Sequence, residues 1–421
     1  MQAGKTRTVI AAGAIGNVLE WYDFAIYGYF ATAIGRAFFP KEDPVAQVLA
    51  AFGIFAVGFL MRPIGGALVG HIGDKLGRRA ALTFSVTAMA IPTFLVGVLP
   101  GYEVLGMAAP FLLTLLRMIQ GLSVGGEYTT SIVFMVEHAP PGRRGLIGAL
   151  GCCGAVAGIL LGSATGALLS AALPTDTMAA WGWRIPFLLG LVVGMAGFFL
   201  RRRLQDVDTG CEAARSPLKE TFREHRGLLA RLAGLSTFNA VGFYLSFVYL
   251  VSWLQIADGI APAHALEINS VSMLVLLPCM VAMGALSDRL GRKPLLLVAT
   301  ALAFLSAVPL FWLMHSDQRL YVQLGQLGLV LSIGMFLGIQ PTLMVEQVPP
   351  AVRCTAIALG YNVTLGIVGG LSPLVATWLV KRTHDQLAPA VMIMVAAAVS
   401  FIAVLTFRET DRTLEPAVSR A

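Results

Sequence analysis

The chain carries twelve apolar runs of about 20 residues or more, and these runs take up most of its 421 residues. A helix needs about 20 mostly apolar residues to cross the ~30 Å hydrocarbon layer of a lipid bilayer. The runs lie at residues 9–34, 46–70, 80–99, 106–136, 146–172, 185–201, 229–256, 267–286, 294–314, 319–345, 354–380 and 388–407. This pattern predicts an all-α, polytopic membrane protein with twelve transmembrane helices and no separate soluble domain.

The composition agrees with a chain that is surrounded by lipid. Hydrophobic residues make up 57% and charged residues only 13%, which would leave a soluble globule of this size without enough polar surface. The formal net charge is +7, but the basic residues form short clusters between the apolar runs instead of an aromatic-interleaved patch. The sequence therefore predicts a lipid bilayer around the chain and excludes nucleic acid as a partner.

The basic residues also predict the orientation of the chain. If the twelve helices alternate in direction, most of the arginines and lysines between the runs fall on one side, among them Arg78, Arg144, Arg292 and Arg408. Short loops that are rich in arginine and lysine stay in the cytoplasm. Both termini are therefore expected in the cytoplasm.

Two pairs of loops repeat one another. Residues 70–79 and 284–293 share the pattern Gly-x-x-x-Asp-(Lys/Arg)-x-Gly-Arg-(Arg/Lys), and residues 136–141 resemble residues 345–350. This duplication predicts two pseudo-symmetric six-helix bundles, and transporters built from such repeats hold their solute at the interface of the halves. The first bundle is expected at residues 1–201, a cytoplasmic linker at 202–228 and the second bundle at 229–421.

The repeated loops carry paired acids and arginines, which predict a cytoplasmic gate. Charge-assisted hydrogen bonds between such groups can hold one arrangement of the helices and release it in another. The predicted gate residues are Asp74, Arg78, Glu137 and Arg144 in the first half and Asp288, Arg292, Glu346 and Arg353 in the second. The alternative is that these charges only end the helices and set the topology, which would account for the arginines but not for the acids.

Five charged residues lie inside the apolar runs of the first half, where charge is costly and therefore indicates function. They are Glu20, Asp23, Arg62, Arg117 and Glu127. At ~1.5 Å of rise per residue, Glu20, Asp23 and Arg117 come within roughly 5 Å of the bilayer midplane. Arg62 and Glu127 lie about 6 to 10 Å from the midplane, toward the cytoplasm. These depths allow Arg117 to pair with Asp23 or Glu20, and Arg62 to pair with Glu127.

A buried carboxylate beside an arginine can take up a proton when an anionic substrate competes for that arginine. We therefore predict proton coupling by Glu20, Asp23 and Glu127. The alternative for each pair is a static salt bridge that holds helices together.

The last six runs contain no charged residue away from their ends and offer neutral polar and aromatic side chains instead. This asymmetry places proton coupling in the first half and much of the solute recognition in the second. The predicted substrate-binding residues of both halves are Asn17, Tyr27, Arg62, Arg117, Gln120, Tyr244, Trp253, Gln340 and Asn362.

Four aromatic residues form a candidate cage for a quaternary ammonium group, which binds to the faces of aromatic rings. They are Trp21, Tyr22, Tyr244 and Tyr249. Taken singly, each of these rings is also explained by ordinary packing. Glycines at a spacing of four residues, Gly154, Gly158, Gly162 and Gly166, predict close helix packing in the fifth run.

The repeated loops resemble the signature of the major facilitator superfamily. Residues 16–24, 58–66, 117–128 and 181–187 are similar to the metabolite:proton symporter family within it, and residues 361–373 most resemble its proline/betaine branch. The resemblance implies uptake with protons, across the bacterial inner membrane, of citrate, 2-oxoglutarate, shikimate, or proline and glycine betaine. The chain ends soon after Arg408, without the long coiled-coil tail of the osmosensing members, which argues against osmotic regulation.

The sequence thus predicts a proton-coupled uptake symporter for a small zwitterion such as proline or glycine betaine, because each buried arginine has one acidic partner and the aromatic set suits an ammonium group. A carboxylate symporter and an export antiporter on the same fold stay open as alternatives. Enzyme and metal-site patterns such as His-x-x-x-His or a Walker loop are not present in the sequence. We expect no metal and no cofactor other than the proton gradient, and a functional monomer.

Overall fold

The structure is a computed structural model that describes residues 17–18, 20–40, 43–65, 68, 78–123, 127–137, 139–202, 225–316 and 318–409. Within these ranges the secondary structure is helical, apart from turns and short connections. We refer to the helices before residue 202 as the first half and to those after residue 225 as the second half.

Residues 20–29 of the first half are helical, and further helices follow them. These are α2 (Ala31–Phe38), α3 (Pro44–Leu60), α5 (Arg78–Val98), α6 (Tyr102–Leu105), α7 (Ala108–Ser123), α8 (Glu127–Glu137), α9 (Arg144–Ala172), α10 (Thr175–Ala180), η1 (Gly182–Arg184) and α11 (Ile185–Arg202).

The second half contains α-helices that are continued in places by π-helical turns. These elements are α13 (Arg226–Phe238), η2 (Asn239–Phe243), η3 (Leu245–Tyr249), α14 (Leu250–Ala257), α15 (Pro262–Leu290), α16 (Arg292–Met314), α17 (Arg319–Gln347), η4 (Pro350–Val352), α18 (Arg353–Thr364), η5 (Leu365–Gly369), α19 (Gly370–Thr383) and α20 (Ala388–Thr406).

Among the described residues, eight helices are long and apolar enough to cross a membrane. They are Pro44–Gly65, Arg144–Ala172, Arg226–Ala257, Pro262–Leu290, Arg292–Met314, Arg319–Gln347, Arg353–Thr383 and Ala388–Thr406. Shorter apolar helices at Phe84–Val98, Ala108–Ser123 and Gly182–Val192 and the helical residues 20–29 and 31–38 fall on the four remaining predicted runs. The order of helices therefore follows the order of apolar runs in the sequence.

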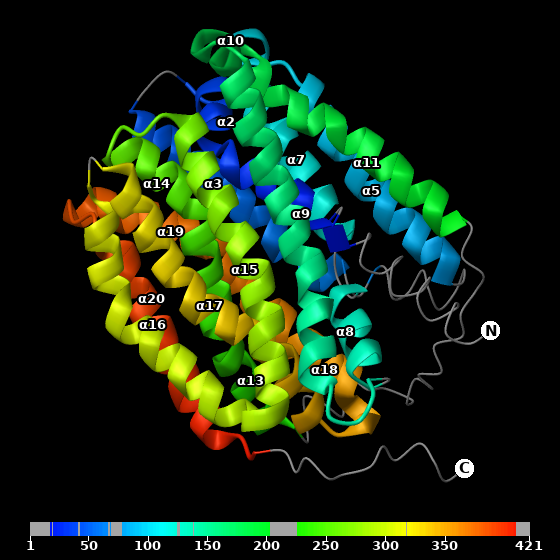
Figure 1. The fold of residues 1–421 in the computed structure, drawn as a ribbon. Coiled ribbons are helices and arrows are strands. Elements are labelled where there is room, and N and C mark those ends of the chain that lie inside the picture. The colour runs from blue at the N-terminus through cyan, green and yellow to red at the C-terminus, as the bar shows by residue number, and fades with distance from the viewer. Residues whose placement is uncertain are drawn as a thin grey trace.

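The helices lie side by side along the long axis of the molecule, with α5 next to α11 at one edge and α16 next to α20 at another (Figure 1). The two halves meet most closely where α9 packs against α15. Glycine permits this approach: a Cβ atom on Gly145 would lie 2.3 Å from the carbonyl oxygen of Gly284.

Charged side chains lie in the interior, and large apolar side chains lie on the outer surface. Arg62 and Arg117 are almost completely buried, whereas large apolar side chains such as Leu168, Leu305 and Trp312 are about 70% exposed. An exposed apolar surface of this kind requires an apolar partner, and for a bundle of membrane-length helices that partner is lipid.

Candidate functional site

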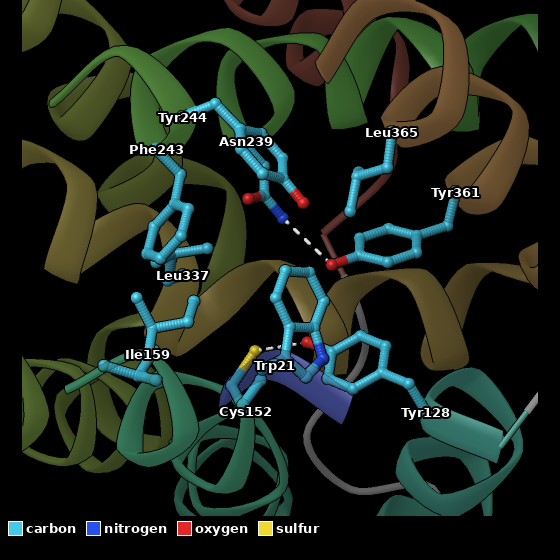
Figure 2. Close-up of a pocket in the computed structure, with 12 residues that line it drawn as sticks. Trp21, Tyr128, Cys152, Ile159, Asn239, Phe243, Tyr244, Leu337, Tyr361 and Leu365 are labelled. Carbon is cyan, nitrogen blue, oxygen red and sulfur yellow. Dashed lines mark hydrogen bonds between the residues drawn. The ribbon is translucent and has the colours of Figure 1, made fainter. Parts of the chain in front are cut away.

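A small cavity lies between the two halves (Figure 2). Its lining residues are Trp21, Tyr128, Cys152, Ala155, Val156 and Ile159 from the first half, and Asn239, Phe243, Tyr244, Leu337, Tyr361 and Leu365 from the second. The cavity volume of ≈ 20 Å³ has room for about one water molecule. A solute with several heavy atoms therefore fits only if the halves move apart.

Aromatic rings from both halves face one another across the cavity. Trp21 and Tyr244 are stacked with ring centroids 6.5 Å apart, and Tyr128 and Tyr361 are stacked at 5.4 Å. The Tyr128 hydroxyl lies 2.6 Å from the Cys152 thiol, and the Asn239 amide donates to the Tyr361 hydroxyl at 3.4 Å (Figure 2). The aromatic surface thus combines π faces with a few polar groups.

The structure places two of the four predicted cage residues at this cavity and two elsewhere. Trp21 and Tyr244 line it. Tyr22 donates its hydroxyl hydrogen bond to the carbonyl oxygen of Pro186 at 2.9 Å, and Tyr249 packs against Phe52 with ring centroids 6.0 Å apart.

Sequence reasoning did not select Tyr128 and Cys152 for the site, and it did not include Tyr361 in the predicted cage. Polar residues recur along one face of the fourth run, at positions 117, 120, 123, 127 and 130, and Tyr128 falls outside this set. Tyr361 begins the stretch 361–373 that carried the proline/betaine resemblance. That resemblance was the available signal for Tyr361.

The predicted substrate-binding residues of the second half lie at different positions relative to the cavity. Gln340 accepts from the Asn239 amide at 2.8 Å and donates to Ser236 at 3.2 Å, so it supports a lining residue from behind. Asn362 is buried next to Tyr361. Trp253 lies away from the cavity, with its ring 5.5 Å from that of Phe311.

Asp23 lies in a hydrogen-bonded cluster with Arg117, whose Nε and Nη2 atoms have no hydrogen-bond partner among the described residues. Its carboxylate accepts from the Thr93 hydroxyl, from the Gln120 amide at 2.9 Å and from Arg117 at 3.4 Å. Gln120 in turn accepts from Arg117 at 3.0 Å, and the Arg117 guanidinium lies 4.3 Å above the Tyr27 ring. The structure therefore contains the expected pair of Asp23 with Arg117, and it brings Gln120 and Tyr27 to it.

Glu20 pairs with Arg62 at 2.9 Å and not with Arg117. The depth estimate had placed Glu20 near Arg117 and had offered Glu127 as the partner of Arg62. It ignored the direction in which each helix face points, and Phe24 packs on Phe59 with ring centroids 4.6 Å apart, which turns this face of the first helix toward α3. The side chain of Glu127 lies outside the described residues.

The end of the molecule that carries the repeated loops is closed by polar contacts between the halves. Asp288 accepts from the backbone amides of Gly145 and Leu146, at 2.8 and 3.0 Å, where α9 begins. Glu137 forms an ion pair with Arg353. Both residues belong to the predicted gate, and their ion pair joins the two halves.

Within the second half, the expected group of charges does come together. Arg292 pairs with Asp288 at 2.8 Å and with Glu346 at 3.3 Å. In the first half, Arg144 contributes its backbone carbonyl, which accepts from Thr342 at 3.2 Å. Asp74 and the side chain of Arg78 lie outside the described residues.

The opposite end of the molecule has a contact between the halves that the sequence did not predict. Lys381, near the end of α19, pairs with Asp43, which also caps α3 by accepting from the Val45 amide at 2.9 Å. The hydrogen bond from Lys381 lowers the pKa of the Asp43 carboxyl, so this pair stays charged at neutral pH and weakens only as the pH falls through that lowered value. The halves are therefore joined at both ends, with the cavity between them.

A bundle of membrane-length helices that encloses a cavity between two halves and is closed by polar contacts at each end has the architecture of a solute carrier. The chain belongs to the Major Facilitator Superfamily, whose family model matches residues 13–373.

Curated relatives extend this similarity over nearly the whole chain. The chain is 37% identical to the glycine betaine/proline/ectoine/pipecolic acid transporter OusA of Dickeya dadantii, covering 97% of this chain and 84% of the relative. It is 36% identical to the proline/betaine transporter of Escherichia coli K12, covering 99% and 87%. A crystal structure of a D-xylose-proton symporter matches the fold with a TM-score of 0.77 at 19% identity, over 97% of this chain and 100% of the other.

These comparisons confirm the main predictions from the sequence. The chain is an all-α multi-pass membrane protein of the twelve-helix, two-bundle type, and it is a transporter and not an enzyme.

Proposed function

We propose that this protein is a proton-coupled symporter that takes up a small zwitterion such as proline or glycine betaine across the bacterial inner membrane. The observation that carries the proposal is the aromatic cavity between the halves, lined by Trp21, Tyr128, Tyr244 and Tyr361. An ammonium group binds to the faces of such rings, with Trp and Tyr the best partners. Relatives that are 35–37% identical are named as transporters of proline and betaine.

A symporter for a di- or tricarboxylate is the less favoured function. Such a substrate needs a cationic group for each carboxylate. Among the described residues, neither lysine nor arginine lines the cavity, and one arginine, Arg62, lies behind the lining residue Trp21. A zwitterion brings its own cation to the aromatic rings and needs a single anion site of this kind.

The proposed transport cycle uses the two halves, residues 1–201 and 229–421, as bodies that move apart at one end at a time. The pairs Glu137–Arg353 and Asp43–Lys381 join the halves at opposite ends, so each has to separate when its own end opens. We place the Glu137 end and both termini in the cytoplasm, following the distribution of basic residues. The proton gradient is the driving force, no other cofactor is involved, and a monomer is sufficient.

Proton coupling is assigned to the buried carboxylates of the first half, Glu20 and Asp23, with Glu127 as a third candidate. Both described carboxylates are at least nine-tenths buried and each pairs with an arginine. Protonation of either one removes a buried charge pair, so an inward proton gradient can be coupled to a rearrangement at this place.

Uptake by purified protein in proteoliposomes tests the proposal. With an acidic outside, we expect accumulation of labelled glycine betaine and proline, competition between the two, and loss of accumulation with a protonophore. Citrate, 2-oxoglutarate and shikimate should compete poorly. Accumulation that requires the reverse gradient would identify an antiporter, and competition by the carboxylates alone would identify the second candidate function.

A pair of tryptophan variants tests the aromatic site. Trp21→Leu should raise the KM for betaine about tenfold, because a desolvated cation–π contact contributes up to about 2 kcal/mol. The matched control is Trp312→Leu, since Trp312 is 70% exposed on the outer surface, and its KM should be that of the wild type. Equal KM values for the two variants would show that the cavity is not part of the substrate-binding site.

A further inference from the structure

Arg62 has more hydrogen-bond donors than the structure fills. Its side chain is 1% exposed and donates from Nη2 to Glu20 at 2.9 Å. The Nε and Nη1 atoms have no hydrogen-bond partner among the described residues. Since nearly all buried donors in proteins are paired, two open donors on a buried guanidinium point to an acceptor that binds there.

Two other buried donors next to Arg62 are open as well. The Trp21 indole nitrogen and the Tyr244 hydroxyl have no hydrogen-bond partner within the described part of the chain. The Arg62 guanidinium lies 5.4 Å from the Trp21 ring centroid. It also lies near the Tyr244 hydroxyl, which can accept from it and still donate its own proton. Trp21 and Tyr244 both line the cavity (Figure 2), so the open donors lie at the boundary between the cavity and Arg62.

A carboxylate matches this set of donors. It carries no donor of its own when ionised and offers two oxygens with about four acceptor positions, and it binds a guanidinium more strongly than a neutral acceptor does. The only carboxylate seen at Arg62 among the described residues is that of Glu20, which occupies one of its nitrogens.

Arg117 also leaves two buried nitrogens, Nε and Nη2, without a hydrogen-bond partner among the described residues. The two arginines therefore differ in their position relative to the cavity and not in their open donors. Neither arginine is itself among the residues that line the cavity, but Arg62 lies against Trp21, which does line it. The Arg117 guanidinium lies against Phe24 and Tyr27, which do not line it. An incoming solute at the aromatic rings therefore meets the Glu20–Arg62 pair before it could reach Asp23.

We propose that Arg62, Trp21 and Tyr244 form the subsite for the substrate carboxylate, and that Glu20 is the carboxylate that the substrate displaces. This inference rests on the proposed function. A proton from the side of higher proton concentration binds to a Glu20 carboxylate oxygen as the Glu20–Arg62 ion pair breaks and the substrate–Arg62 ion pair forms. When the substrate leaves on the other side, the proton leaves Glu20 and the original pair is restored, so one proton crosses with each substrate.

Glu20 is not the only titratable group in this region, and the other groups have to be considered as carriers of the proton. Tyr128, Tyr361 and Cys152 line the same cavity as Tyr244, but unperturbed tyrosine and cysteine ionise only near pH 10 and about 8.5. Asp23, paired with Arg117, lies one helical turn from Glu20 along the chain. Glu127 precedes Tyr128 in α8. Asp23 and Glu127 are therefore the competing proton carriers.

The pH dependence of substrate binding separates these carriers. In the purified wild type, the Kd for glycine betaine should rise up to tenfold per pH unit toward alkaline pH, because binding takes up one proton. In Glu20→Gln the Kd should be tight and independent of pH. This variant should still exchange labelled for unlabelled betaine across proteoliposomes but should not accumulate it with a pH gradient.

Glu103→Gln is the matched control, because it neutralises an exposed glutamate in the short helix α6 outside the apolar helices, and it should behave as the wild type. A pH slope that persists in Glu20→Gln overturns the assignment of Glu20. A slope that disappears in Asp23→Asn or Glu127→Gln while it persists in Glu20→Gln assigns the proton to that residue instead.

Choline tests the carboxylate subsite, since it has the quaternary ammonium group of betaine without the carboxylate. The wild type should bind betaine much more tightly than choline, and Arg62→Gln should reduce this preference about 10- to 100-fold, the contribution expected of hydrogen bonds to a charged group. Arg62→Lys should restore part of it. An unchanged preference in Arg62→Gln overturns the subsite.

The wild type distinguishes a failure of this inference from a failure of the proposed function. If the wild type neither binds nor accumulates betaine or proline, the proposed function fails and this inference fails with it. If the wild type binds and accumulates them and only the variants behave differently from expectation, the inference alone fails.

Discussion

Arg62 and Arg117 show how much a single buried charge constrains its surroundings. Both guanidinium groups are 1% exposed or less, and each lies against aromatic rings and pairs with one carboxylate. A buried ion pair tolerates replacement of both partners better than loss of one, because the remaining charge has no compensation. The two ion pairs therefore have similar chemistry but different surroundings. Arg62 lies against Trp21 at the cavity, and Arg117 lies in a polar cluster.

Neutralising Asp23 should destabilise the protein. Asp23→Asn leaves Arg117 as a buried cation without a countercharge, a change that costs about 3–5 kcal/mol in comparable sites. We expect a clearly lower Tm for the purified variant in detergent. Asp43→Asn is the control, since its ion pair with Lys381 is exposed and such pairs contribute little. Equal Tm values for the two variants would contradict this account of Arg117.

Cys152 should report on access to the cavity. It is buried and lines the cavity, so a membrane-permeant thiol reagent should inhibit uptake when the cavity opens, and saturating betaine should protect. Cys152→Ala should be resistant to the reagent. Single alanine variants of Cys153, Cys279 and Cys354 serve as controls and should stay sensitive. Sensitivity that persists in Cys152→Ala would place the reactive thiol elsewhere.

At the scale of the element, α9 illustrates how small residues determine helix packing. The predicted glycine ribbon faces the first helix: a Cβ on Gly158 would lie 2.3 Å from the carbonyl oxygen of Val18, and one on Gly162 would lie 3.2 Å from Ile26. A Cβ on Gly158 would meet backbone, which cannot rotate away. The atoms nearest to a Cβ on Gly162 are side-chain carbons of Ile26 and Ala25, and they lie farther off, at 3.2 and 3.3 Å. The close-packing prediction made from the four-residue spacing holds for these positions.

The two glycine environments predict different effects of alanine. Gly158→Ala should destabilise the protein by about 1–3 kcal/mol, the usual cost of overpacking. Gly53→Ala is the matched control in α3, because a Cβ there meets nothing within 4 Å and alanine favours a helix by about 1 kcal/mol over glycine. Thermal unfolding in detergent should rank Gly53→Ala above Gly158→Ala, and the reverse order would contradict the packing.

The second half shows a different use of the helix. Its π-helical turns η2 and η5 supply Asn239, Phe243 and Leu365 to the cavity. A π-turn adds a residue to the helical turn, which shifts the side-chain directions beyond it, and such turns are common at functional sites. Apolar periodicity in the sequence predicts a helix at these positions without indicating the shift.

On the scale of the whole molecule, the structure is closed at both ends. Glu137 pairs with Arg353 at one end and Asp43 pairs with Lys381 at the other. The cavity between them is too small for a solute with several heavy atoms, since it holds about one water molecule. The contacts at each end therefore have to separate before a solute can pass between the halves there.

Cross-linking tests whether both ends have to open. Disulfides in the double variants Asp43→Cys with Lys381→Cys and Glu137→Cys with Arg353→Cys should each abolish uptake, and a reducing agent should restore it, because transport requires each end to separate in turn. The four single-cysteine variants are the controls and should be unaffected by oxidation. Uptake at the wild-type rate through either cross-linked protein would show that this end does not gate the solute.

The amino-acid sequence alone predicts the number and order of the membrane helices, the repeat and the presence of charges inside the first half. Each of these follows from local properties, namely the length of an apolar run and the cost of charge within it. The family resemblance also followed from contiguous stretches of the sequence, and the comparisons agree with it.

The interaction partners of these charged and aromatic side chains became known from the packing of the helices. The estimated depth in the membrane predicts that Glu20, Asp23 and Arg117 lie together. The rotation of the first helix instead turns Glu20 toward Arg62, with which it forms an ion pair. In the same way, Arg353 forms an ion pair with Glu137 across the halves, and Tyr128 stacks on Tyr361 at the cavity. These contacts join residues that lie far apart in the chain, and they depend on how the helices rotate and cross when they pack, which periodicity within a single helix does not contain.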